Sequence, residues 1–472
     1  MPSDLFNWLM NLKLSAVLAI LMLFGLPRAH GFALEGPNDV SYQTGALGYN
    51  GGRAPQTLGE EYRFNIPVLT YGFDSSFINY FGTNGIRAIE AAFRQVNDLP
   101  AVSLVTDQVL TNNFPLSSQG INPTATSLSL LDIRSLFLTD LVKYMGLSDA
   151  ERYTWTLRSR WVIGTPSITN YVVIQKNYDP ITRVNSDTVN GRRFSYVIIE
   201  DYYGQGTTDA VETDLSGFQA FGTSVASDLT LRVGGSFSSL TYDDMGGLRY
   251  IYATNNFNVE NLLPSVAVTS TAASASTGSP WSPVGVTNIL PVAGSGAVNV
   301  ALRGGIDKVS FVRVDFDSLL GIGFVGVTNT WTDRYIASQS QNSVFQSQTL
   351  ARPILQPDII FSAADLGLGP NIPISYSRSV GNFINNDAIN GQPGQNGPGL
   401  NVVPQLQVQF STVLPYYLNQ NPGFISGPFF GFSSGAFAFF DDTTIYQLFP
   451  DFLNLQFSDL ERMLLEARST IE

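Results

Sequence analysis

The first third of the chain changes from a strand pattern to a helix pattern. Residues 66–74 (IPVLTYGFD) have the β-branched and aromatic side chains that are typical of a strand. In the next segment apolar residues recur at helical spacing from Ile86 to Val96, until Pro100 ends the run. A strand followed directly by an amphipathic helix predicts an α/β arrangement for this part of the chain.

Two later segments carry helix start and stop signals. An apolar stripe begins after Ser129, which opens a capping box, and ends at Gly146, a common C-terminal cap. The segment LTYDDMGGLRYIYATNN (240–256) opens with a second capping box, formed by Thr241 and Asp244. Its two adjacent glycines cost a helix about 1 kcal/mol each relative to alanine. We therefore expect this helix to pack closely against another element.

The second half of the chain has no comparable helical stripe. Residues 265–285 form a linker rich in Ser, Thr and Ala, and residues 286–450 alternate short apolar runs with Gly, Pro and Asn turns. Residues 451–472 end the chain with a short amphipathic helix. These patterns predict an α+β protein with an α/β domain at 32–264 and a separate β-rich, sandwich-like domain. A chain that ends near Pro264 should then fold alone.

The N-terminal residues have the pattern of a secretory signal. Lys13 precedes the apolar run 14–26, and small residues follow, so we expect 1–31 to be a signal peptide cleaved after Gly31 or, alternatively, after Ala33. No later stretch is apolar and long enough to span a membrane. We expect the mature chain outside the cell or at its surface, and the lack of cysteine in an exported chain favours a bacterial source.

The composition excludes several kinds of chemistry. A net charge of −13 argues against a nucleic-acid partner, because phosphate binding depends on Lys and Arg. The chain has no cysteine, and its single histidine, His30, lies at the expected cleavage site and should be removed with the signal. Ser-His-Asp triads, Cys-His pairs and His-ligated zinc sites all need residues that such a mature chain lacks. We expect no cofactor, and carboxylate chemistry is the main catalytic option that remains.

Over about residues 62–256, the order of strand, amphipathic helix, long apolar helix and late helix resembles the matrixin branch of the metzincin zinc proteases. The segment LTYDDMGGLRYIY is similar to the last helix of the catalytic domain in that family. The resemblance implies that the helix ending at Gly146 corresponds to the helix that carries the family's His-Glu-x-x-His-x-x-Gly-x-x-His motif. That motif supplies three zinc ligands and a general base.

This chain departs from the family at the functional positions of the motif. With Gly146 on the motif's glycine, Thr139, Lys143 and Asp149 stand where the histidines belong, and Asp140 stands where the glutamate belongs. A hydroxyl, an ammonium group and a carboxylate do not replace three imidazoles around zinc. The resemblance therefore implies a metalloprotease-like fold without its metal site. The alternative is that Thr139, Asp140 and Lys143 form the polar side of an ordinary core helix.

Other acidic and aromatic positions offer weaker sites. Asp243 and Asp244 are interpreted as first-turn acids favoured by the helix dipole and not as metal ligands. Asp315 and Asp317 are expected on one face of a strand and are calcium candidates, although they lack the ligand density of an EF-hand loop. The phenylalanine-rich segment 425–442 is expected to be mostly buried, and it would serve self-assembly if it were exposed.

Together these observations predict a secreted, catalytically inactive metalloprotease-like protein that binds an extracellular protein or glycan. Two alternatives remain open: a hydrolase that uses a pair of carboxylates, and a structural or surface-layer subunit. A deep pocket with converging carboxylates would favour the hydrolase. A filled protease cleft and a flat apolar edge would favour binding or assembly.

Overall fold

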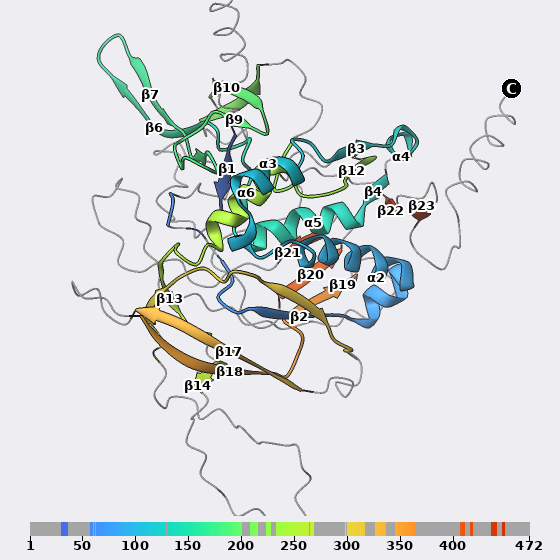
Figure 1. The fold of residues 1–472 in the computed structure, drawn as a ribbon. Coiled ribbons are helices and arrows are strands. Elements are labelled where there is room, and N and C mark those ends of the chain that lie inside the picture. The colour runs from blue at the N-terminus through green and yellow to red at the C-terminus, as the bar shows by residue number, and fades with distance from the viewer. Residues whose placement is uncertain are drawn as a thin grey trace, which may run out of the picture.

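The computed structural model describes residues 30–35, 57–59, 61, 63–128, 130–200, 208–215, 223–227, 233–263, 265–268, 298, 300–316, 326–336, 345–363, 406–410, 416–418, 436–440 and 446–448. These residues form an α+β protein in which helices pack on a mixed sheet, and a second, antiparallel sheet lies beside it (Figure 1). None of the helices in this part of the chain has the length and apolar character needed to cross a membrane.

The mixed sheet has five strands in the order β16-β2-β19-β20-β21. Neighbouring strands from β16 to β20 are parallel, and β21 runs antiparallel to β20. The strand β2 is a central strand, which explains its nearly continuous apolar sequence. In chain order the strands are β2 (Val68–Phe73), β16 (Ser310–Arg313), β19 (Ile359–Ser362), β20 (Leu406–Phe410) and β21 (Tyr416–Leu418).

Three longer helices belong to this part of the fold, and two of them, α2 and α5, contact the mixed sheet. The first of them lies against β2, β16 and β19 and also contacts the second helix. A short 3-10 turn and two short helices lie between the first and the second. In chain order the elements are α2 (Ser75–Asn97), η2 (Val102–Leu104), α3 (Asp107–Asn113), α4 (Pro123–Ser127), α5 (Ile133–Tyr144) and α6 (Tyr242–Ile251).

The antiparallel sheet has the order β13-β15-β17-β18-β14. Its two longest strands, β17 and β18, form a hairpin that Figure 1 shows at the lower left of the molecule. The strand β15 is followed after a short connection by β16, so one stretch of chain links this sheet to the mixed sheet. The strands are β13 (Asn258–Asn261), β14 (Ala267–Val268), β15 (Val300–Arg303), β17 (Val327–Ile336) and β18 (Gln346–Ile354).

Five smaller sheets complete the described part of the chain. One is the three-stranded β5-β1-β8, and another, β23-β22-β4, joins a strand of the first half of the sequence to two strands of the second half. The two-stranded β6-β7 projects from the body as a hairpin (Figure 1). The strands are β1 (Phe32–Leu34), β3 (Gln119–Ile121), β4 (Leu130–Asp132), β5 (Leu147–Ser148), β6 (Thr156–Ile163), β7 (Ile168–Ile174), β8 (Asn177–Tyr178), β9 (Thr188–Val189), β10 (Arg192–Ile199), β11 (Asp209–Asp214), β12 (Gly235–Phe237), β22 (Ala436–Phe440) and β23 (Tyr446–Leu448).

The local predictions for the first half agree well with these elements. The strand expected at 66–74 is β2, and the capping box of Thr241 and Asp244 is present at the start of α6. The apolar stripe after Ser129 begins differently from the prediction, because residues 130–132 form β4 and Asp132 caps α5. This strand exists only because β22 pairs with it, and that partner could not be seen from local sequence.

The two adjacent glycines of α6 have the close contacts that were predicted. A Cβ atom at Gly246 would lie 2.5 Å from Pro180 Cβ. A Cβ atom at Gly247 would lie 2.5 Å from Leu147 Cδ2 and 3.0 Å from Phe32 Cβ. The helix therefore tolerates two glycines because β1 and the turn after β8 pack directly on its backbone.

The predicted separation into domains at 32–264 and 286–450 is wrong. Strands from the second half complete the sheet around β2, and β22 pairs with β4. A central strand needs a partner on each side, and both partners of β2 come from after the predicted linker. Three aromatic pairs join the halves in one core: Phe73 with Phe361, Phe81 with Phe410 and Phe93 with Phe311, with centroids 5.2, 4.9 and 5.1 Å apart.

Several other predictions fall partly or wholly outside the described residues. Of the linker 265–285, only residues 265–268 are described, and they include β14. The signal segment up to residue 29 and the C-terminal helix expected within 451–472 lie outside. Of the segment 425–442, residues 436–440 are described, and the side chains of Phe437, Phe439 and Phe440 are buried as expected.

The residues on both sides of the expected cleavage site after Gly31 are packed into the fold. His30 is buried, and its ring stacks on Tyr242 with centroids 4.0 Å apart. Phe32 and Leu34 belong to the main core, and β1 pairs with both β5 and β8. Cleavage after Ala33 would therefore remove most of a buried strand.

Candidate functional site

The helix α5 is enclosed along its whole length. All of its residues are buried, including Thr139, Asp140 and Lys143, which are 0–1% exposed. These three residues therefore belong to a helix of the core, and their polar side is enclosed by other parts of the protein. Asp149 is also buried, and its Oδ1 accepts hydrogen bonds from Ser227 Oγ and the backbone N–H of Arg152.

No metal site can be assembled around these positions in the part of the chain that the structure describes. That part contains no group of three or more His, Cys, Asp or Glu side chains arranged to hold a metal ion. Asp315 lies in an exposed position just after β16 and not within a strand, and Asp317 lies outside the described residues. Asp315 therefore does not lie on a strand face, as the predicted arrangement of the two acids required.

The first-turn acids of α6 fix the structure around them. Asp243 Oδ2 accepts hydrogen bonds from the backbone N–H groups of Gly31, at 2.9 Å, and Asn190. Asp244 accepts hydrogen bonds from the backbone N–H groups of Val225 and Ala226, at 2.9 and 3.0 Å. Burial raises the pKa of Asp243 well above its usual value, although these hydrogen bonds oppose the shift. Their location in the first turn is as predicted, and their role is to hold three distant loops on one helix end.

The accessible candidate site is a pocket between the two large sheets, next to the C-terminal end of α6. It has a volume of about 470 Å³, which is within the range of small-molecule sites. Residues from both halves of the sequence line it, and none of Thr139, Asp140, Lys143 and Asp149 does. The lining comes from the segment before β2, the segment from the end of α6 into β13, the β15–β16 connection, β17 and the start of β18.

The outer wall of the pocket is aromatic. Trp331 on β17 is partly exposed. The rings of Phe257 and Phe345 lie 5.6 Å apart, and Phe345 is 50% exposed. The guanidinium carbon of Arg334 lies 5.4 Å from the centre of the Phe345 ring, a cation–π distance. The pocket thus presents apolar ring faces next to an accessible cation.

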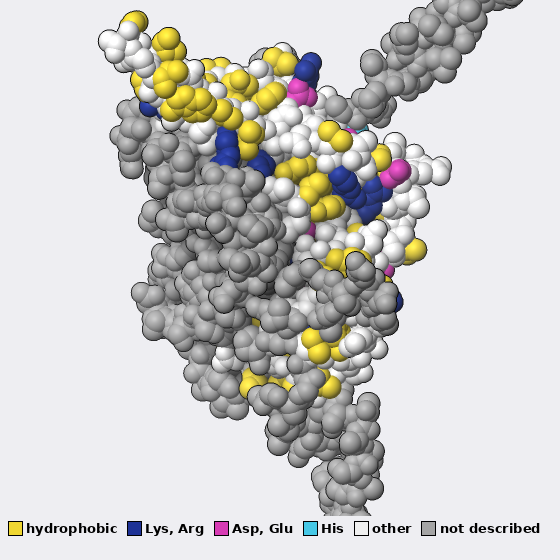
Figure 2. Space-filling model, turned by 90° about the vertical axis from the view of Figure 1, so that its left-hand side faces the viewer, with side chains coloured by type: hydrophobic (Ala, Val, Ile, Leu, Met, Phe, Trp, Pro, Cys, Tyr) yellow, Lys and Arg dark blue, Asp and Glu magenta, His cyan; other side chains and the backbone are white. Residues whose placement is uncertain are grey.

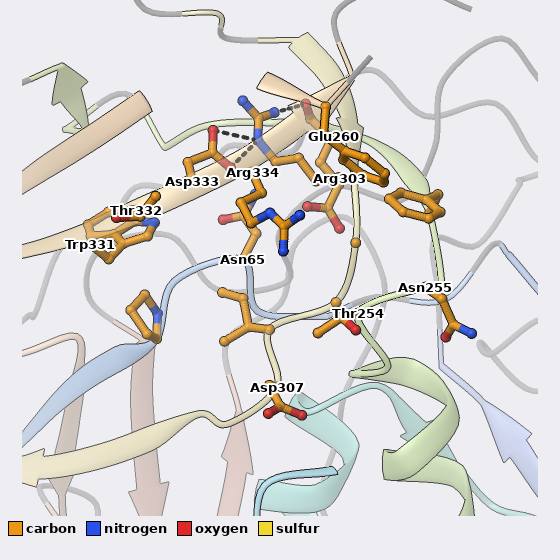
Figure 3. Close-up of a pocket in the computed structure, with 16 residues that line it drawn as sticks. Asn65, Thr254, Asn255, Glu260, Arg303, Asp307, Trp331, Thr332, Asp333 and Arg334 are labelled. Carbon is orange, nitrogen blue, oxygen red and sulfur yellow. Dashed lines mark hydrogen bonds and ion pairs between the residues drawn. The ribbon is translucent and has the colours of Figure 1, made fainter. Parts of the chain in front are cut away.

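The inner wall is a buried ion-pair network. Figure 3 shows Arg303 between Asp333 and Glu260 at one end of the pocket, with Asp307 at the opposite end. Arg303 Nε donates to both carboxylate oxygens of Asp333, at 3.0 and 3.1 Å. Arg303 also donates to the carbonyl of Glu260 at 2.7 Å, so it connects β13 to β17 through β15.

Glu260 is a buried carboxyl in the pocket lining. Its Oε1 accepts a hydrogen bond of 2.5 Å from Arg63 Nε, whereas its Oε2 is buried and has no partner among the described residues. Burial raises the pKa of Glu260, and the neighbouring Asp333 adds to the rise, while Arg63 and Arg303 oppose it. A buried carboxyl with a raised pKa and an unfilled hydrogen-bonding position in a cavity is typical of a binding or catalytic site.

The β15–β16 connection forms the floor of the pocket because it has no side chains at two positions. A Cβ atom at Gly304 would lie 2.1 Å from the Thr254 carbonyl oxygen, and one at Gly305 would lie 2.4 Å from the Tyr252 carbonyl carbon. Gly305 N also donates to the Ala253 carbonyl at 3.0 Å. Only glycine allows the connection to approach the end of α6 so closely.

No known protein family, no curated protein and no solved structure matches this chain. The candidate site therefore rests on the geometry of its own residues.

The sequence contains a weak signal for this site. Trp331 and Asp333 stand two residues apart on one strand, which places them on the same side of the sheet. The pair Gly304-Gly305 directly after β15 marks a close backbone approach. Neither signal identifies Glu260, because its role depends on Arg63, which is 197 residues away in the sequence.

A second buried carboxyl, Glu151, should make the stability of the protein depend on pH. Its Oε1 accepts hydrogen bonds from Thr223 N and Oγ1, and burial raises its pKa from 4.5 to about 7. Because the folded pKa is raised, the stabilisation is complete below pH 4.5 and is lost as the pH rises to about 7. A change of this size corresponds to a loss of about 3 kcal/mol in the free energy of unfolding.

We expect Glu151→Gln to remove this contribution, which urea unfolding at several pH values would measure. The variant should show a shallower fall in the free energy of unfolding between pH 4.5 and 7 than the wild type. Asp98→Asn, at an exposed position, is the control and should keep the wild-type slope. Equal slopes for wild type and Glu151→Gln would contradict the raised pKa.

Proposed function

We propose that this chain is a secreted or cell-surface protein that binds a small polar ligand of the carbohydrate class and has no metalloprotease activity. The observation that carries the proposal is the aromatic and polar pocket of about 470 Å³ lined by Trp331, Glu260 and Arg334. The positions that would carry protease chemistry in a matrixin are buried in α5 and, for Asp149, just after it, whereas this pocket is accessible.

The chemistry of the pocket suits a neutral sugar better than an ion or a purely apolar ligand. A pyranose ring has C–H groups on its faces, which pack on aromatic rings such as Trp331. Its hydroxyls both donate and accept hydrogen bonds, so they can use the carboxyl of Glu260, the guanidinium of Arg334 and the amide of Asn255. The buried charges of Arg303 and Asp333 neutralise each other, which leaves no large net charge to select an ionic ligand.

The proposal includes a matrixin-like origin for the first half. The succession β2, α2, α5 and α6 supports it, because these elements follow one another in the order that the resemblance expects along residues 62–256. We propose that such a metzincin-like core lost its zinc ligands and gained a β-rich part, from β15 onward, that supplies most strands of the mixed sheet. Secretion, a bacterial source and a signal peptide at 1–31 belong to the same proposal.

The binding test uses the purified full-length mature protein and a panel of monosaccharides and disaccharides. We expect at least one sugar of the panel to bind with a dissociation constant in the millimolar range or tighter, measured by calorimetry and by saturation-transfer NMR. Trp331→Ala and Arg334→Ala should each weaken binding at least tenfold, which corresponds to about 1.4 kcal/mol.

Arg87→Ala is the charge-matched control, because Arg87 is an exposed arginine on α2 that lies outside the pocket. Its sugar affinity should equal that of the wild type. Absence of binding to every sugar of the panel, or equal loss in Arg87→Ala and Arg334→Ala, would overturn the proposal. Thermal melting of each variant separates a lost contact from a lost fold.

A second candidate function is hydrolysis of a glycosidic bond, with Glu260 as the general acid. The raised pKa of Glu260 and its unpartnered Oε2 favour this role. Asp333 is the nearest second carboxylate in the pocket lining, but Arg303 and Gln348 hold it by three hydrogen bonds. Turnover of chromogenic aryl glycosides that falls at least a hundredfold in Glu260→Gln would favour hydrolysis over simple binding.

A further inference from the structure

The pocket lining contains one charged side chain that the fold itself does not use. Five charged residues line the pocket, and four of them have ion-pair or hydrogen-bond partners within the protein. The four are Glu260, Arg303, Asp307 and Asp333. The fifth, Arg334, is exposed and has neither an ion pair nor a hydrogen bond among the described residues. Its five N–H donors are therefore available to a ligand.

The surroundings of Arg334 hold its guanidinium in place without neutralising it. The guanidinium carbon lies 5.4 Å from the centre of the Phe345 ring. Across the sheet Arg334 pairs with Ser347, and its neighbours on the same face of β17 are Thr332 and Ile336. None of these side chains carries a charge. The acidic residues that give the chain its net charge of −13 are screened beyond about 8–10 Å, so the cation keeps its local attraction for an anion.

A carboxylate on a sugar ring fits this corner of the pocket. The guanidinium is a planar fork, and it binds the two oxygens of a carboxylate through two parallel N–H···O bonds. The Phe345 ring beside it is 50% exposed, so a sugar ring can pack its C–H groups there. A uronic acid carries both groups, because its carboxylate is attached directly to the pyranose ring.

The spacing along β17 places this acidic sugar beside the neutral one. Trp331 and Arg334 are three residues apart on the strand, so their Cα atoms lie about 10 Å apart. This span exceeds the length of a single pyranose ring. A neutral sugar on Trp331 and a carboxylate at Arg334 therefore fit two neighbouring units of one chain.

We propose that the pocket takes an acidic oligosaccharide, in which a neutral sugar packs on Trp331 and the next unit is a uronic acid whose carboxylate binds Arg334. This inference rests on the proposed function, because it specifies which carbohydrate the pocket takes. The balanced charges of Arg303 and Asp333 select the neutral unit, and Arg334 selects the acidic one. Phe345 is a positioning residue for the guanidinium.

The test is calorimetry on the full-length mature protein with matched pairs of disaccharides. Each pair joins the sugar that binds best in the panel above to a hexuronic acid or to the same hexose with the carboxyl reduced to an alcohol, in several linkages. We expect the acidic member of at least one pair to bind at least tenfold more tightly at low salt. This preference should fall below threefold between about 0.01 and 1 M salt, because the Debye length falls from about 30 to about 3 Å.

Variants at the pocket separate the charge of Arg334 from its other contacts. Arg334→Gln keeps a hydrogen-bonding side chain and removes the charge, so the two members of a pair should bind within twofold of each other. Phe345→Leu removes the ring beside the guanidinium and should reduce the preference at least threefold. Arg87→Gln, at an exposed position on α2 outside the pocket, is the control and should keep the full preference. Thermal melting of each variant confirms that the fold is intact.

The outcomes distinguish this inference from the function on which it rests. If no sugar of the panel and no disaccharide binds, both are wrong. If neutral sugars bind and every pair shows equal affinities, or if the preference persists in Arg334→Gln, the acidic unit is wrong and the carbohydrate pocket stands. A sulfated form of the reduced disaccharide that binds more tightly than the uronic acid would overturn the assignment of a carboxylate.

Discussion

A chain that ends at residue 264 should not fold, and this is the largest effect that we expect. The truncation removes β16, β19, β20 and β21 and leaves β2 without a neighbour on either side. It also removes Asp358, whose Oδ2 accepts hydrogen bonds from Thr70 N and Oγ1 at 2.8 and 3.1 Å. The backbone N–H and C=O groups of β2 would then lose their hydrogen-bond partners in the sheet. The helix α2 would also lose most of the surface on which its apolar side packs.

The apolar loss is larger than the stability of a typical domain. Eight side chains of the second half that are larger than alanine belong to the same buried cluster as α2 and α5, and burial of each contributes roughly 1.5–3 kcal/mol. Their sum, on the order of 10–25 kcal/mol, exceeds the usual net stability of roughly 5–15 kcal/mol. The eight are Val309, Phe311, Ile359, Phe361, Val408, Phe410, Phe437 and Phe439.

Circular dichroism and proton NMR of residues 30–264 would measure this effect. We expect no cooperative melting and little dispersion of amide signals. Co-expression of 265–472 as a separate chain is the control, because it returns the missing strands and should restore a soluble complex. A cooperative, monomeric fragment 30–264 would instead support two independent domains.

The second large effect is expected at Arg63, whose side chain is among the largest that are fully buried. Its guanidinium donates to Glu260 and to three carbonyls, those of Ile251, Asn256 and Arg303. It therefore ties the end of α6 to β13 and β15 beneath the pocket. Arg63→Met should lower the free energy of unfolding by about 3–5 kcal/mol, because it leaves a buried carboxyl without its cation.

Urea unfolding of a double-mutant cycle would separate the contributions. Glu260→Gln combined with Arg63→Met removes both charges and should recover about 1–2 kcal/mol relative to Arg63→Met alone. The recovery should be incomplete, since the three carbonyls still lack their donor. Arg87→Met at an exposed position should change stability by no more than about 0.5 kcal/mol. A loss below about 1 kcal/mol for Arg63→Met would show that the network contributes little.

Both expectations have the same structural origin, because the pocket and the core lie where the two halves of the chain meet. Glu260 belongs to the first half, and Arg303 and Trp331 belong to the second. Neither half contains a complete ligand site. A variant that weakens the contact between the halves should therefore lose ligand binding together with stability, whereas Arg334→Ala, at an exposed position, should lose binding alone.

The sequence by itself determined the features that depend on neighbouring residues. The apolar run of β2, the capping box of Thr241 and Asp244 and the close packing of Gly246 and Gly247 follow from short-range rules of sterics and hydrogen bonding. The exclusion of cysteine chemistry follows from composition alone, because the chain contains no cysteine. These features can be predicted without knowing which distant segments pack together.

Only the tertiary structure decided which distant segments pair and which polar groups are enclosed. The strand β2 finds its partners more than 200 residues later, and β4 becomes a strand because β22 lies beside it. Thr139, Asp140 and Lys143 have the pattern of an exposed helix side, yet they are buried. The tip of the β6–β7 hairpin has the pattern of a buried strand, yet Ile163 and Ile168 are exposed, and Figure 2 shows hydrophobic side chains gathered at the top of the molecule, where this hairpin projects. Burial depends on what surrounds an element in space, and periodicity along the chain reports only which residues share a face.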